Sequence, residues 1–74
     1  MTEAQLKECE VMAHRFLYYV MDEPALPDMV YDALERSARA VCPPDSPVQG
    51  VGSSLRSSYT EEHIQRAHEL AGTL

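Results

Sequence analysis

The chemistry of this chain is concentrated between residues 18 and 32, where three phenol rings and four carboxylates lie close together in the sequence. The candidate site residues among them are Tyr18, Tyr19, Asp28, Tyr31 and Asp32. The face of an aromatic ring attracts a cation, and carboxylates add Coulomb attraction and accept hydrogen bonds from amides and hydroxyls. Such a group suits a ligand that is flat and positively charged. In the alternative reading, the rings only pack across a helical joint while the acids cap and solubilise a helix.

Two helices must position these side chains. Residues 3–21 contain no Gly or Pro and carry apolar residues at helical spacing, which predicts a helix with one buried stripe. The stripe comprises Leu6, Cys9, Ala13, Phe16, Leu17 and Val20. The prolines of residues 22–27 end this helix, and Asp28 is expected to cap a second one over about 29–41. The second helix is expected to bury Val30, Ala33, Leu34, Ser37 and Val41.

The remainder of the chain predicts a loop and a third helix. Residues 43–58 are rich in Pro, Gly and Ser, which indicates turns or a loop without helix. Thr60 is a suitable N-cap, followed by two glutamates that favour the positive end of a helix, so a helix is expected from Thr60 to about residue 72. Its apolar side should include Ile64, Ala67, Leu70, Ala71 and Leu74. We therefore predict an all-α fold, a single three-helix domain over 1–74 built on an antiparallel helical hairpin.

At 100° per residue, Tyr18 lies opposite the stripe of the first helix, near Arg15, and Tyr19 lies on its flank. On the second helix Asp32 points away from the expected core, and Tyr31 lies at its edge. The pattern predicts an outward-facing hollow lined by rings and acids. An oxidised nicotinamide ring, which is flat, cationic and joined to a ribose diol, would suit such a hollow, although periodicity alone cannot select it.

Composition excludes several classes of function. The net charge of −6 has the wrong sign for independent binding of a phosphate backbone. No apolar run approaches the ~20 residues of a membrane span, and the N-terminus lacks the features of a signal peptide, so we expect a cytoplasmic protein with no membrane or direct nucleic-acid partner. Cys9 and Cys42 have no partners at metal-ligand spacing, so no metal site is expected. Because the core of so short a chain is thin, a homodimer would add buried surface, and the sequence does not decide whether one forms.

The segment "YYVMDEPALPDMVYDAL", followed by "PPDSPVQGVG" at 43–52, resembles the N-terminal Ia domain of bacterial NAD-dependent DNA ligases. The resemblance covers about residues 5–52. It implies that Tyr18, Tyr19, Asp28, Tyr31 and Asp32 contact the nicotinamide mononucleotide (NMN) half of NAD. The helix at about 60–72 is expected to diverge from the family.

The resemblance also implies what this sequence lacks. The K-x-D-G motif of the adenylated lysine is absent, and the sole lysine is Lys7. Where the family has a basic residue before V-G, this chain has Gly50. We therefore expect a non-enzymatic, stand-alone module that binds NMN or NAD weakly and acts in trans with a ligase adenylation domain.

Two alternative functions involve no nucleotide ligand. The chain could be a protein-interaction module or antagonist derived from the ligase domain, such as a phage or mobile-element regulator that binds a host protein. It could also be a structural relic without a ligand.

Overall fold

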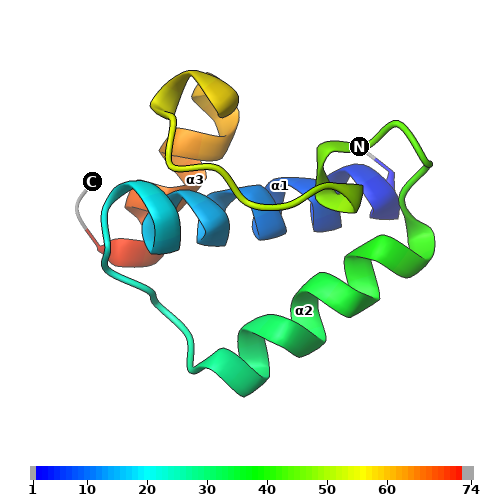
Figure 1. The fold of residues 1–74 in the computed structure, drawn as a ribbon, viewed down its shortest axis with the longest axis horizontal. Helices are drawn as coiled ribbons and strands as arrows, with labels where there is room; N and C mark the ends of the chain where they lie inside the picture. Colours follow the sequence, from blue (N-terminus) through cyan, green and yellow to red (C-terminus); the bar gives the residue numbers. More distant parts are fainter. Residues whose placement is uncertain (1, 73–74) are drawn as a thin grey trace.

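The computed structural model describes residues 2–72 and contains three α-helices, as predicted (Figure 1). The elements, in chain order, are α1 (Glu3–Arg15), the π-helical turn η1 (Phe16–Val20), α2 (Asp28–Val41), the 3-10 turns η2 (Pro47–Gln49) and η3 (Arg56–Ser58), and α3 (Glu61–Ala71). No strand occurs between residues 2 and 72. The all-α class is confirmed. The two 3-10 turns correct the expectation that 43–58 would contain no helix.

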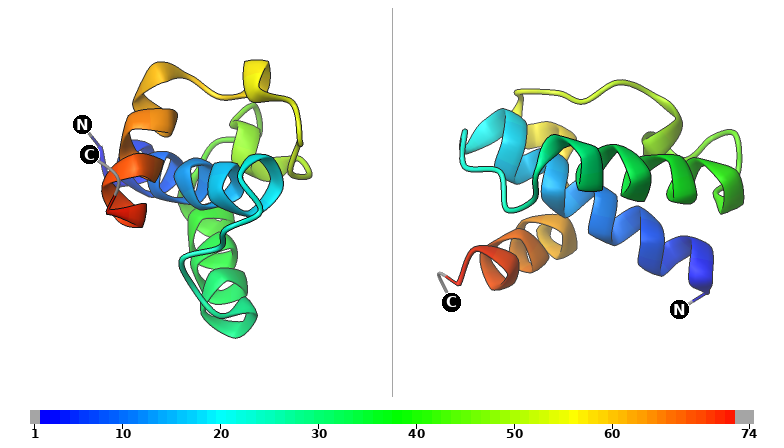
Figure 2. Two further views of the ribbon diagram at one scale, coloured as in Figure 1. Left: turned by 90° about the vertical axis from the view of Figure 1, so that its left-hand side faces the viewer. Right: turned by 90° about the horizontal axis from the view of Figure 1, so that it is seen from below.

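Helix α1 is the centre of the molecule. Helices α2 and α3 lie on different sides of it, and the segment between them runs back along α1 (Figure 2). Every residue from Val11 to Leu17 is therefore buried, on all faces of the helix. A helix that is enclosed all round buries polar residues with apolar ones, which a single stripe cannot express. The predicted stripe is correct for Ala13, Phe16 and Leu17 and wrong for Leu6, which is 53% exposed.

The first two helices form the predicted antiparallel hairpin. Near the start of α1, the Cys42 thiol lies 3.4 Å from the carbonyl oxygen of Ala4, whereas near its end Tyr18 stacks on Tyr31. The turn between the helices depends on Asp22, whose φ of 55° places it in the left-handed region. Aspartate tolerates this region better than most residues, and a left-handed residue just after a helix is a common way to end it.

The face of α2 that packs on α1 differs from the predicted one by about one residue. Ala38 and Cys42 are buried and Tyr31, Leu34 and Glu35 are partly buried along the inner face. The residues expected in the core are mostly outside: Val30 is 49% exposed, Val41 is 42% exposed, and Ala33 is also exposed. The reason is that α2 meets α1 through a polar pair and a ring, which the hydrophobic pattern could not reveal.

The predicted N-cap is confirmed for α3 and wrong for α2. Thr60 caps α3 as predicted: its hydroxyl accepts from the amide of His63, while Nδ1 of His63 accepts from the amide of Thr60. Asp28 does not cap α2, because Pro27 occupies the N-cap position and Asp28 is the first helical residue. Of the expected apolar side of α3, Ile64 and Ala67 are buried, whereas Leu74 lies outside the described residues.

Candidate functional site

Three tyrosine rings gather where η1 meets the first turn of α2. Tyr18 and Tyr31 are nearly parallel, with ring centroids 5.9 Å apart and planes inclined by 12°. Tyr19 meets Tyr18 edge to face at 5.0 Å and 63°. Offset stacks and edge-to-face pairs are the favoured arrangements of aromatic rings. The rings form one connected cluster, in which Tyr18 and Tyr19 remain 40% and 42% exposed.

The π-turn makes this cluster possible. In η1 the amide of Met21 donates to the carbonyl of Phe16 at 3.1 Å, five residues earlier, so the turn is wider than a regular one. The wider turn allows the consecutive Tyr18 and Tyr19 both to reach the surface beside α2. The 100° periodicity assumed for the sequence placed Tyr18 outward correctly, but it contained no signal for the π-turn.

The two candidate acids share one face of α2. Asp28 and Asp32 are both exposed and are four residues apart, which places them one above the other on the helix surface. Tyr31 lies between them in sequence and adjoins the same face. The five residues predicted as binding residues are thus distributed over η1 and the first turns of α2, at one end of the hairpin.

Of the predicted hollow lined by rings and acids, the space between Tyr18 and Tyr31 is closed. The stacked pair Tyr18–Tyr31 closes the space between the two rings, because inserting a third ring needs two stacking gaps of about 3.5 Å each. A hollow of about 270 Å³ does lie beside Asp32, and its other lining residues are Glu35, Arg36 and Arg39. It is a charged surface depression on α2 without an aromatic wall.

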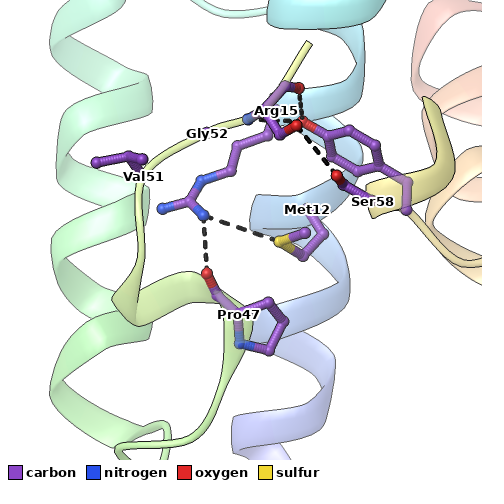
Figure 3. A pocket seen from close by; sticks show the side chains of 8 residues that line it. Met12, Arg15, Pro47, Val51, Gly52 and Ser58 are labelled. Atoms are coloured by element: carbon purple, nitrogen blue, oxygen red, sulfur yellow. Dashed lines mark hydrogen bonds between the residues drawn. The ribbon is translucent and has the colours of Figure 1, made fainter. Parts of the chain in front are cut away.

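A second hollow, of about 160 Å³, lies under the loop that follows η2, and Figure 3 shows it. Its lining includes Met12, Arg15, Gly52, Ser58 and Tyr59. The Nε of Arg15 is buried here and has no acceptor among residues 2–72. A polar hollow of this size has room for water.

Arg15 is the residue that the helical pattern misplaced most. It was expected on the outer side near Tyr18, but it is only 1% exposed. One terminal nitrogen, Nη2, donates to the Glu35 carboxylate at 2.7 Å and to the carbonyls of Val48 and Gly50 at 3.0 and 2.9 Å. The other, Nη1, donates to the carbonyl of Pro47 at 3.0 Å (Figure 3). Only the folded chain brings these acceptors together.

This buried pair lies next to Tyr31 and affects its ionisation. Burial raises the pKa of Tyr31 to about 12; Arg15 opposes the rise, and the Glu35 carboxylate adds to it. The hydroxyl is buried and has no hydrogen-bond partner within the described part of the chain. Tyr31 is therefore neutral at physiological pH, and the part of it suited to a ligand is the ring.

The segment that contains these residues matches a known protein family. A family described as the DNA ligase-like, N-terminal NAD+-binding domain matches residues 2–52. The chain belongs to this family. The match contains all five candidate residues of the ligase-like domain, as well as Arg15 and the loop through Gly52.

Its relatives include several DNA ligases. That of Pseudomonas syringae pv. tomato is 41% identical over 69 residues, covering 84% of this chain and 8% of the ligase. That of Cellvibrio japonicus is 41% identical over 68 residues, covering 81% of the chain and 10% of the ligase. Both shares of the chain exceed what residues 1–52 could supply, so the likeness continues past Gly52. The ligase-like chain spans about a tenth of these relatives' length, and no solved structure matches it.

Within residues 2–72, the ligase-like domain contains no group of three or more His, Cys, Asp or Glu side chains arranged to hold a metal ion. In the same range, none of its helices is both long enough and apolar enough to cross a membrane.

Proposed function

We propose that this chain is a non-catalytic recognition module for the NMN half of NAD, and that Tyr18, Tyr19, Asp28, Tyr31 and Asp32 form its binding surface. The observation that carries the proposal is the tyrosine cluster beside two exposed carboxylates, in a domain whose family is described as NAD+-binding. The exposed rings offer a face to the cationic nicotinamide, and the carboxylates offer acceptors to the ribose hydroxyls and the carboxamide.

The stack of Tyr18 on Tyr31 constrains how the nucleotide binds. The nicotinamide ring either lies on an outer face of the cluster or separates the two phenol rings on entering. An open surface buries little of a small ligand, so the affinity of the isolated chain should be weak, with a dissociation constant above about 0.1 mM.

The chemistry of adenylation has no candidate in this chain. Its one lysine, Lys7, lies in α1, where the ammonium donates to the hydroxyl of Ser37, a contact that joins the two helices of the hairpin. We propose that the nucleophilic lysine belongs to a ligase adenylation domain, with which this cytoplasmic module acts in trans.

The ligand titration is the test of this proposal. Addition of millimolar NMN should shift the NMR resonances of Tyr18, Tyr31 and Asp32, and the variants Tyr18→Ala and Asp32→Ala should lose these shifts. Because Asp32 is exposed, the melting temperature of Asp32→Ala should remain within a few degrees of the wild type. Tyr18→Ala loses two ring contacts and should melt lower, so its titration is carried out well below its transition.

Asp45→Ala provides the matched control, because Asp45 is also exposed but follows the opposite end of α2. Its NMN-induced shifts should equal those of the wild-type chain. A wild-type spectrum that does not respond to millimolar NMN or NAD would refute the recognition function.

A second function is favoured by a different observation. The apolar face of α2 that contains Val30, Ala33 and Val41 is exposed, and Met29 at its edge is 82% exposed. Within residues 2–72 no segment covers this face. We propose that it contacts a protein, and that the adenylation domain of a ligase is the partner; a host protein of another kind or a second copy of this chain are the other outcomes of the test.

A further inference from the structure

The loop motif "PPDSPVQGVG" has no role in the site as proposed so far, yet it touches that site at one point. A Cβ atom placed on Gly52 would lie 2.0 Å from Cε2 of Tyr19 and 2.6 Å from two further atoms of the same ring. No real Cβ contact is this short, so the ring occupies the space that any other residue at position 52 would need. The ring of Tyr19 lies directly on the backbone of the loop.

From this contact we propose that the segment 47–52 positions the binding surface, and that Gly52 is a positioning residue that sets the place of the Tyr19 ring. The inference rests on the proposed function, because it assigns the loop to the same nucleotide site.

The loop is held firmly enough to act as such a support. Arg15 from α1 donates to the carbonyls of Pro47, Val48 and Gly50. Arg39 from α2 donates to the carbonyls of Val48 and Gly50 at 3.0 and 3.3 Å. Both arginines bind the Glu35 carboxylate, which fixes their orientation. These contacts hold three carbonyls between Pro47 and Gly50, two residues before Gly52, so both helices of the hairpin restrain the position of the loop.

Comparison with Gly50, in the same loop, shows that only position 52 of the two requires a residue without a Cβ atom. A Cβ on Gly50 would lie 3.7 Å from the carbonyl oxygen of Pro47, which is an ordinary contact. No positive φ is found at Gly50 or Gly52. An alanine is therefore acceptable at 50, whereas at 52 it requires the ring of Tyr19 to move.

Movement of that ring would affect the rest of the cluster. Tyr19 contacts Tyr18 at 5.0 Å between centroids, and Tyr18 stacks on Tyr31 at 5.9 Å. A binding surface depends on its side chains being held near the productive geometry by the residues around them. Gly52 thus controls the outermost member of a chain of three rings without contacting the ligand itself.

A double-mutant cycle on the 74-residue chain tests the proposal. Gly52→Ala should weaken NMN binding about tenfold, which corresponds to about 1.4 kcal/mol. Gly50→Ala, the matched control, should bind as the wild type does. When Tyr19 is already alanine, adding Gly52→Ala should cause no further loss of NMN affinity, because the ring that it displaces is absent. For the same reason the double variant should melt at the same temperature as Tyr19→Ala alone.

Two spectra of the wild-type loop remain informative even if Gly52→Ala does not fold. Tyr19→Leu should shift the Hα resonances of Gly52 strongly, through loss of the ring current, and those of Gly50 little. NMN added to the unmodified chain should move the amide resonance of Gly52 more than that of Gly50.

The outcomes separate this role from the function on which it rests. Equal NMN affinity of Gly52→Ala and the wild type, or equal losses with and without Tyr19, overturns the positioning role alone. If Gly52→Ala does not fold, an NMN-insensitive Gly52 amide overturns it. A wild-type chain that does not bind NMN overturns the proposed function together with this role, while the Hα shifts still test the contact between Tyr19 and Gly52.

Discussion

At the scale of single residues, Arg15 shows how a buried charge can organise a small domain. Its guanidinium is almost fully enclosed, and burial, the largest single influence, would lower its pKa. The interactions with Glu35 and Tyr31 together outweigh burial and raise the pKa above the ordinary value. Arginine suits this place because its planar group presents several donors in fixed directions. The carbonyls it binds lie more than 30 residues away in sequence.

We predict that Arg15→Met destabilises the chain by about 3–5 kcal/mol, because it leaves the Glu35 carboxylate and several buried carbonyls without their donor. Chemical denaturation followed by circular dichroism measures the change. Arg15→Lys should not restore the loss, since one ammonium cannot replace the two terminal nitrogens.

Arg36→Met is the control for this substitution. Arg36 is exposed on the same helix as Glu35, so its replacement should change the free energy of unfolding by less than about 0.5 kcal/mol. Equal effects at positions 15 and 36 would contradict the role assigned to the buried guanidinium.

Among the helices, α3 has the start that depends most directly on pH. Nδ1 of His63 must be unprotonated to accept from the amide of Thr60, and burial lowers the pKa of His63 despite the neighbouring Glu8 and Glu62. Burial likewise lowers the pKa of His14. The folded chain therefore binds fewer protons than the unfolded chain just below the ordinary histidine pKa of about 6.5.

It follows that both histidines contribute stability that is complete above about pH 6.5 and is lost as the pH falls toward their lowered folded values. The free energy of unfolding should decrease between about pH 7 and about pH 5. His63→Gln keeps an acceptor at this position without titrating. It should therefore reduce the pH dependence of the free energy of unfolding to the part that His14 contributes. An unchanged slope in this variant would show that the cap does not titrate.

The limits of sequence-based prediction are clearest at this scale. Helix ends carry local signals. The prolines at 24 and 27 and the cap at Thr60 gave the boundaries of α2, of α3 and of α1 taken together with η1 to within a few residues, although α1 itself ends at Arg15. The π-turn η1 has no such signal. Helix orientation was less accessible still, because the inner face of α2 is decided by Arg15 and Glu35, whose meeting depends on the whole fold.

Considered as a whole, the molecule has an unusual distribution of apolar residues on α2. The apolar face that the pattern identified is real, yet Val30 and Val41 lie half outside while Glu35 lies within. The hydrophobic pattern correctly identified an apolar face on α2, but its expectation that this face is buried against the first helix is wrong. The site residues, which the resemblance supplied position by position, stay a prediction, whereas the predicted packing of α2 could be compared with the fold and differs from it.

This surface yields a prediction about association. Val30→Asp and Val41→Asp should each weaken binding to a ligase adenylation domain about tenfold or more, because a charge would have to be buried at the contact. The NMN-induced NMR shifts of the isolated chain should be unchanged. Isothermal titration measures the first effect.

Glu61→Gln is a neutral control on the exposed surface of α3. Light scattering with the wild-type chain alone distinguishes a second copy from a different partner. Undiminished affinity in both aspartate variants would exclude this face as the contact.

The wide turn η1 has a consequence for reading related genomes. Its carbonyl-to-amide spacing of five residues means that the surface depends on chain length here, as well as on which residues are present. A descendant that lost one residue between Phe16 and Met21 could keep both tyrosines and every aspartate, yet it would rotate the phenols out of register with the second helix. In a related sequence, a one-residue gap at this point would therefore indicate loss of the binding surface more clearly than a substituted tyrosine would.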